Sequence, residues 1–153
     1  MELPQPVPFY YIQIKDDRGE TFCLQPKDPK KEPSQLTLIA ANGHSEQQWA
    51  FIRTSRLDEY RIVNGYSGYS ADAAGDSKDP GNGTKVQQHS WEQQENQHWR
   101  VSQTDKGTQL KSAYNDKAWV VEGGKVKVNA KIILNDLSPK SNPNEYFTLV
   151  PVS

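Results

Sequence analysis

The stretch Gln47-Gln48-Trp49 recurs as Gln97-His98-Trp99, and a third, weaker copy stands at Glu145-Tyr146-Phe147. The copies begin 50 and 48 residues apart, which is close to one third of the 153-residue chain. A fixed period of this size indicates a repeat architecture. The three copies therefore provide a register in which positions of different repeats can be compared.

Strand-like patterns accompany each copy of this signature. Alternating apolar residues follow it at 49–52, 99–101 and 147–150, as expected of strands. A second shared element lies 25 to 28 residues upstream and consists of an aromatic residue followed by apolar and polar ones. Its aromatics are Phe22, Tyr69 and Trp119. We expect one domain over residues 1–153, built from repeats at about 9–56, 57–107 and 108–153.

Composition excludes several classes of protein. The net charge is −1 with acids and bases interspersed, so no basic surface for nucleic acid is implied. No apolar run approaches the roughly 18 residues that a membrane span needs. The single cysteine, Cys23, rules out an internal disulfide framework, and we expect it to fill space in the core. The first residues lack the pattern of a signal peptide, which favours a cytoplasmic protein or one released by a non-classical route.

An all-β fold is predicted because helix signals are almost absent. Turn pairs such as Asn42-Gly43, Asn64-Gly65 and Asn82-Gly83 separate short apolar segments. The strongest strand candidates lie at 9–15, 35–40, 60–63, 85–88, 118–121 and 131–134. Three units too small to bury their own apolar faces must share a core, and a closed barrel capped by hairpins leaves no unpaired edge. We expect the signature aromatics in that core, with the signature glutamines bonded to backbone groups of loops.

With these repeats, the chain resembles the ricin-B-type lectins, whose β-trefoil fold has three pseudo-symmetric repeats that end in Gln-x-Trp. The resemblance covers nearly the whole chain and is strongest to small single-domain lectins of fungi. In that family an Asp, an aromatic residue and an Asn, in this order, form the sugar pocket of a repeat. The middle repeat matches the pattern, which assigns these roles to Asp72, His89 and Asn96, with Gln97 supporting. Trp91, two residues beyond His89, is an alternative stacking platform, and spacing alone leaves the choice open.

These residue types suit a carbohydrate ligand. An ionised Asp accepts hydrogen bonds from two neighbouring hydroxyls, and a charged acceptor forms the stronger bonds. An Asn side chain both donates and accepts, so it can bond a hydroxyl whose proton is already committed. A flat ring covers the apolar face that galactose-like sugars present. The resemblance therefore implies binding of galactose or N-acetylgalactosamine.

The other two repeats depart from the pattern. In the first, Gln25, Ile39 and Glu46 stand where the acid, the platform and the amide are expected. The third keeps Glu122 and Asn144, but it has Asn135 at the platform and Glu145 in place of the supporting Gln. One intact pocket predicts weak monosaccharide binding, at about 0.1–10 mM. Useful avidity would then need oligomerisation or a longer glycan.

A carbohydrate-binding lectin is thus the leading functional hypothesis, with glycans and glycoproteins as partners and, by family analogy, a role in defence. A homodimer is an open option. The sequence has no catalytic signature, the residues His44, His89, His98 and Cys23 lack metal-type spacing, and no cofactor is implied. Because β-trefoils also include protease inhibitors, the loops at 27–33 and 76–83 motivate an inhibitor as the alternative. A structural or storage module is a third reading.

Overall fold

The computed structural model describes residues 7–75, 79–140 and 142–153. Within these ranges the chain forms twelve β-strands and four 3₁₀ helices of one turn each. The strands are β1 (Phe9–Lys15), β2 (Thr21–Pro26), β3 (Ser34–Ala40), β4 (Gln48–Arg53), β5 (Glu59–Asn64), β6 (Ser70–Ala73), β7 (Val86–His89), β8 (Trp99–Thr104), β9 (Gly107–Ser112), β10 (Ala118–Val121), β11 (Ile132–Asn135) and β12 (Thr148–Pro151). The helices are η1 (Ser45–Gln47), η2 (Glu95–Gln97), η3 (Glu122–Gly124) and η4 (Pro143–Glu145).

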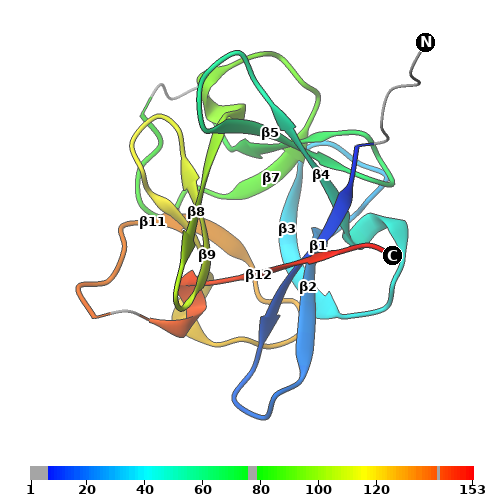
Figure 1. The fold of residues 1–153 in the computed structure, drawn as a ribbon, viewed down its shortest axis with the longest axis vertical. Helices are drawn as coiled ribbons and strands as arrows, with labels where there is room; N and C mark the ends of the chain where they lie inside the picture. Colours follow the sequence, from blue (N-terminus) through cyan, green and yellow to red (C-terminus); the bar gives the residue numbers. More distant parts are fainter. Residues whose placement is uncertain (1–6, 76–78, 141) are drawn as a thin grey trace.

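Six of these strands close a barrel. Pairing runs from β1 to β4, β5, β8 and β9, and β12 returns to pair with β1. A bridge between Thr108 and Phe147 connects β9 to the start of β12. Figure 1 shows β12 (red) beside β1 (blue), so that the first and last strands meet in the barrel wall. Closure leaves the barrel without a free edge strand.

Three hairpins cap the barrel and contact one another. They are formed by β2 with β3, β6 with β7, and β10 with β11. The first and second hairpins meet at Ser34 and Gln88, the first and third at Thr37 and Lys131. The arrangement confirms the predicted all-β β-trefoil. We refer to β1–β4, β5–β8 and β9–β12 as lobes one, two and three.

The signature aromatics lie in the shared core, as predicted. Trp49 and Trp99 are 0% exposed and Phe147 is 1% exposed. The indole nitrogens of the two tryptophans donate to the carbonyl oxygens of Leu24 and Ala71, each at 3.0 Å. Burial of three large aromatics from three lobes gives the lobes a common apolar core.

The polar member of the signature bonds the backbone ahead of it, which was also predicted. Gln47 Oε1 accepts from the Asn42 amide at 3.0 Å, and its Nε2 donates to the Ala40 carbonyl at 3.1 Å. In the third copy, Glu145 Oε1 accepts from the Ser138 amide at 2.8 Å. These bonds satisfy loop groups that the barrel ladder leaves unpaired.

The strand predictions hold closely. Those at 9–15 and 118–121 have the observed bounds, the one at 35–40 differs from β3 by one residue at its start, and the other three differ from β5, β7 and β11 by one residue at each end. Cys23 is buried in β2, and burial raises the pKa of its thiol to about 11. No helix in the described part of the chain has the length and apolar character needed to span a membrane.

Candidate functional site

The backbone register fixes which positions of the lobes are equivalent. Trp49 and Trp99 donate to Leu24 and Ala71 in the same way, so Gln25 of lobe one corresponds to Asp72 of lobe two. Asn96 Nδ2 donates to the Ala73 carbonyl at 2.9 Å. Lobe one therefore carries a neutral amide where lobe two carries the predicted acid.

The third lobe corrects one prediction. Asn144 Nδ2 donates to the Val121 carbonyl at 3.2 Å, so Val121 corresponds to Ala73, and Val120 corresponds to Asp72. Glu122, predicted as the acid of this lobe, is two residues out of register and lies exposed at the start of η3.

The error came from matching the wrong aromatic. Trp119 was taken as the counterpart of Phe22 and Tyr69, but by the observed register it corresponds to Ala71, and Lys117 occupies the aromatic position. The strand ladders agree, because Ala118 pairs with Asn135 as Ser70 pairs with His89. Asn135 therefore stands at the platform position, as predicted. The third lobe has an aliphatic side chain in place of the acid.

In lobe two, Asp72 is a buried carboxylate held by two amides. It lies on β6 and is 5% exposed. Its Oδ1 accepts from Gln87 Nε2 at 3.1 Å, and its Oδ2 accepts from Gln97 Nε2 at 3.0 Å. Burial raises the pKa of Asp72 to about 6, against the lowering effect of the Gln87 bond, the charge of His89 and the Gln97 bond. The carboxyl group is therefore poised to titrate just below neutral pH.

Gln97 connects the acid to the segment that follows β7. Besides Asp72, its Nε2 donates to the Ser90 carbonyl at 2.7 Å, and its Oε1 accepts from the Glu92 amide at 2.7 Å. The Gln97 side chain is fully buried, and its bond to Asp72 forms away from water. The predicted supporting role of Gln97 thus has a structural basis in η2.

Gln87 is a member of this cluster that the sequence reasoning missed. It lies on β7 directly opposite Asp72, while His89 lies opposite Ser70. Because residues two apart on a strand share a face, Gln87 and His89 both project on the side of Asp72. The available signal was the position of Gln87 two residues before His89, which places both on one face of the predicted strand.

His89 and Asn96 flank the acid on different elements. The His89 ring is partly exposed at the end of β7, with Nδ1 3.1 Å from Glu92 Oε1 and 3.2 Å from the Ser90 carbonyl. Asn96 lies in η2, and its bond to Ala73 ties the segment after β6 to that helix. The fold thus brings together Asp72, His89, Asn96 and Gln97 from β6, β7 and η2.

Trp91 packs against Arg61 and His98. The Arg61 guanidinium carbon stands 4.7 Å from the centroid of the Trp91 ring, and the His98 ring centroid is 5.3 Å away. Arg61 in turn donates from Nε to Ser70 Oγ at 2.8 Å, which fixes it over the indole. One face of Trp91 is thus engaged in a cation–π contact.

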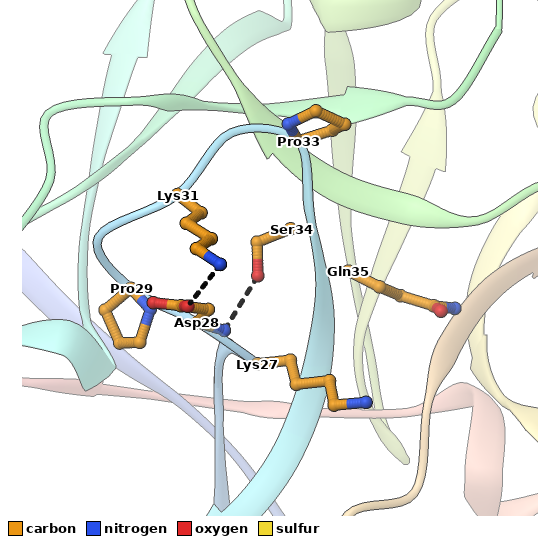
Figure 2. Close-up of a pocket in the computed structure, with 7 residues that line it drawn as sticks. All are labelled: Lys27, Asp28, Pro29, Lys31, Pro33, Ser34 and Gln35. Atoms are coloured by element: carbon orange, nitrogen blue, oxygen red, sulfur yellow. Dashed lines mark hydrogen bonds and ion pairs between the residues drawn. The ribbon is translucent and has the colours of Figure 1, made fainter.

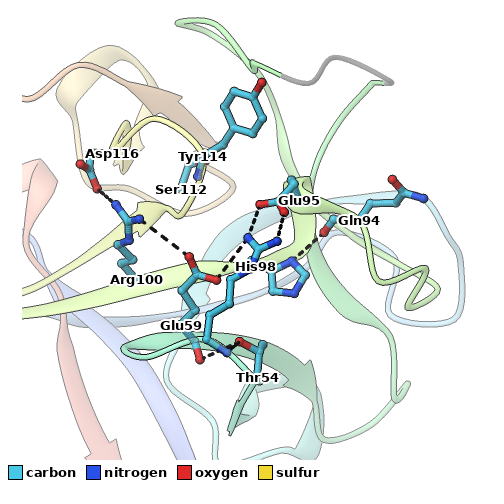
Figure 3. A network of polar contacts seen from close by, with 10 residues as sticks. Thr54, Glu59, Gln94, Glu95, His98, Arg100, Ser112, Tyr114 and Asp116 are labelled. Atoms are coloured by element: carbon cyan, nitrogen blue, oxygen red, sulfur yellow. Dashed lines mark hydrogen bonds and ion pairs between the residues drawn. The ribbon is translucent and has the colours of Figure 1, made fainter.

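A network of charged side chains contacts the helix η2 through Glu95. Arg56 donates to both carboxylate oxygens of Glu95, including a 2.7 Å bond from Nη1 to Oε2. Glu59, which is buried, lies 3.6 Å from Arg56 and 3.8 Å from Arg100, and Arg100 pairs with Asp116 at 2.9 Å. In Figure 3, Glu59 lies between Arg100 on one side and Glu95 on the other, and dashed lines mark the contacts of each carboxylate. The network links β5, η2 and β8, and so holds the helix that carries Asn96 and Gln97.

The Arg56–Glu95 pair of this network lies at the surface, whereas Glu59 is buried. The Arg56 guanidinium holds the pKa of Glu95 below its ordinary value. Among the described residues, no group of three or more His, Cys, Asp or Glu side chains could hold a metal ion.

Comparison with known proteins places this geometry in a family. A family model described as "Ricin-type beta-trefoil lectin domain-like" matches residues 45–135, which is more than half of the chain. The chain belongs to this ricin-type β-trefoil lectin-like family. The matched stretch runs from η1 to β11 and contains the whole of lobe two. Membership supports carbohydrate binding in general.

Solved structures agree on the fold of this ricin-type domain. The designed three-fold symmetric protein ThreeFoil has a TM-score of 0.78 and 23% identity, over 92% of this chain and 97% of its own. The Rhizoctonia solani agglutinin has a TM-score of 0.78 and 14% identity, over 99% of each chain. The Polyporus squamosus lectin has a TM-score of 0.76 and 17% identity, over 96% of this chain. The ricin-type domain spans 50% of that lectin's length. No curated protein matches it in sequence.

Proposed function

We propose that this protein is a lectin that binds galactose-type or N-acetylgalactosamine-type glycans through lobe two. The observation that carries the proposal is the Asp72 carboxylate, held by Gln87 and Gln97 with His89 and Asn96 beside it. Lobes one and three lack an acid at this position. A single site per chain follows.

The chemistry of the site fits sugar hydroxyls. Each Asp72 oxygen accepts one bond from the protein, and a carboxylate oxygen has a second lone pair that a sugar hydroxyl can use. Asn96 uses one amide hydrogen on Ala73, and its second hydrogen and its Oδ1 suit a neighbouring hydroxyl. The His89 ring provides an apolar surface next to these groups. The Polyporus squamosus lectin was solved with Neu5Aca2-6Galb1-4GlcNAc, a glycan that contains galactose, and this supports the same sugar class here.

We further propose binding without catalysis. The Asp72 carboxylate accepts hydrogen bonds from two amide side chains. This arrangement fixes the carboxylate as an acceptor for sugar hydroxyls and does not suit a group that must transfer a proton. The inhibitor alternative needs a projecting loop at 27–33, but three carbonyl oxygens of that loop accept bonds from Gln88. Residues 76–78 of the second loop lie outside the described residues.

A glycan array followed by calorimetric titration with galactose and N-acetylgalactosamine tests the proposal. We expect millimolar binding of the monosaccharide, stronger binding of clustered glycans, and loss of both in Asp72→Ala. Exposed Glu20 of lobe one provides a matched control, and Glu20→Ala should bind as the wild type does. Binding that survives Asp72→Ala unchanged would refute the site, and no binding to any glycan would refute the function.

A further inference from the structure

The loop between β2 and β3 of lobe one lies on lobe two. Gln88, a fully buried residue of β7, donates from Nε2 to the carbonyl oxygens of Lys31 at 2.6 Å, Pro29 at 3.2 Å and Asp28 at 3.5 Å. Gln88 directly precedes His89, so the loop is attached beside the proposed sugar platform.

The 27–33 loop has few apolar side chains that could pack and fix its conformation. A pocket of about 480 Å³ is lined by this loop and the start of β3. Most of its lining side chains, drawn in Figure 2, are polar. Across it, the Asp28 amide donates to Ser34 Oγ at 2.8 Å, and Lys31 Nζ lies 3.8 Å from Asp28 Oδ2. The position of the loop therefore depends on directional polar contacts.

One of these contacts reaches the site itself. Glu32 Oε2 accepts from both the amide and the hydroxyl of Ser90, each at 2.5 Å. The bond from the Ser90 hydroxyl holds the pKa of Glu32 below its ordinary value. Ser90 directly follows His89, and its carbonyl accepts from Gln97, which also bonds Asp72. A continuous series of bonds thus connects Glu32, Ser90, Gln97 and Asp72.

The other lobes show that this contact is particular to lobe two. The register makes Ala40 and Asp136 the counterparts of Ser90. Ala40 has no hydroxyl to offer an acid. Asp136 has the reverse chemistry: its carboxylate accepts from Asn82 of the preceding lobe at 3.0 Å and from Lys117 at 2.7 Å. A loop of one lobe thus meets the end of a neighbouring hairpin in lobes two and three, but only lobe two pairs an acid with a hydroxyl beside its platform.

We propose that Glu32 is a positioning residue of the lobe-two site, which holds the His89–Ser90 segment in place from lobe one. This inference rests on the proposed sugar-binding function. It makes the site a joint product of two lobes, in which Glu32 and Ser90 set the orientation of the His89 ring relative to Asp72. Glu32 itself touches Ser90 rather than the sugar.

The test is a double-mutant cycle on Glu32→Ala and Ser90→Ala, with Glu20→Ala as the control for loss of one acidic charge. We expect each single variant to weaken galactose binding about fivefold, and the double variant to be no weaker than either single one. The Glu20→Ala variant should be unchanged. Thermal unfolding of each variant, measured in parallel, identifies those that remain folded at the assay temperature.

A second readout needs no sugar. In ¹H–¹³C spectra of the free protein, the His89 ring signals should shift or broaden in Glu32→Ala and in Ser90→Ala, while those of His44 stay in place. Unchanged His89 signals together with unchanged affinity would overturn the positioning role, even if Asp72→Ala abolishes binding. If the wild type binds no sugar, the proposed function fails, and the His89 spectra still decide whether Glu32 positions the ring.

Discussion

Replacing Asp72 by Asn is expected to weaken sugar binding strongly while leaving the fold intact. Lobe one shows that the position tolerates a neutral amide, because Gln25 occupies it and its Oε1 accepts from Gln47 Nε2 at 3.0 Å. The Asn side chain keeps one acceptor oxygen but loses the charge. Hydrogen bonds to charged groups contribute roughly 1.5–3 kcal/mol each, so loss of the charged acceptor should weaken binding by about 2–3 kcal/mol. This corresponds to about 30- to 150-fold in Kd.

The role of the Asp72 charge also predicts how galactose affinity depends on pH. With a pKa of about 6, Asp72 is mostly ionised at pH 7 and mostly protonated at pH 5, a change of about tenfold in the ionised fraction. Wild-type affinity for galactose should fall by about the same factor between these values. The remaining galactose affinity of the Asp72→Asn variant should not change between pH 5 and pH 7.

Stability should show the opposite trend. Because burial raises the pKa of Asp72 in the folded state, its contribution to stability is fully present below the ordinary value of 3.8 and is lost as the pH rises through about 6. The Asn variant lacks this term, so its unfolding temperature relative to the wild type should rise between pH 4 and pH 7. Calorimetric titration at pH 5, 6 and 7 measures the effect on affinity, and thermal unfolding between pH 4 and pH 7 measures the effect on stability. Equal galactose affinity in the two proteins at pH 7 would refute the reasoning.

Three further predictions concern neighbouring positions. Gln88→Ala should lower the free energy of unfolding by about 1–3 kcal/mol in urea titrations, because carbonyls of the 27–33 loop lose a buried donor; no change would show that water replaces it. Trp91→Ala should leave galactose affinity within about twofold, whereas His89→Ala should weaken it by about 0.5–1.5 kcal/mol; the reverse order would make Trp91 the platform. In lobe three, Val120→Asp should destabilise the protein, because a new acid faces Glu145, and adding Glu145→Gln should restore part of the lost stability in thermal unfolding.

The repeat signature was sufficient to predict the scaffold. Trp49, Trp99 and Phe147 are buried as expected, and the strand bounds at 9–15 and 118–121 are those of the structure. These properties follow from local alternation and from the apolar character of single residues, so they can be read without knowing the pairing of strands. The same holds for the glutamine of the signature, which bonds groups only a few residues away.

The site was predictable only where its members keep the spacing of the signature. Asp72 and Gln97 are joined as expected, with His89 and Asn96 close by. In lobe three the prediction of the acid position was wrong because Trp119 lies two residues beyond the position that Phe22 and Tyr69 occupy in the other lobes. Only the β10–β11 pairing and the bond from Asn144 identify Val120 as the counterpart of Asp72. A shift of two residues keeps the same strand face, so polarity alone could not reveal it.

The sequence by itself thus determined three strand-rich repeats, a common aromatic core and one lobe that keeps the acid, the ring and the amide together. Tertiary structure decided which side chains surround that acid. Gln87 lies opposite Asp72 through strand pairing, and Glu32 reaches Ser90 across 58 residues of chain and a lobe boundary. The reason is physical: side-chain periodicity is a property of neighbouring residues, whereas hydrogen bonds between lobes depend on how the closed barrel brings distant loops together.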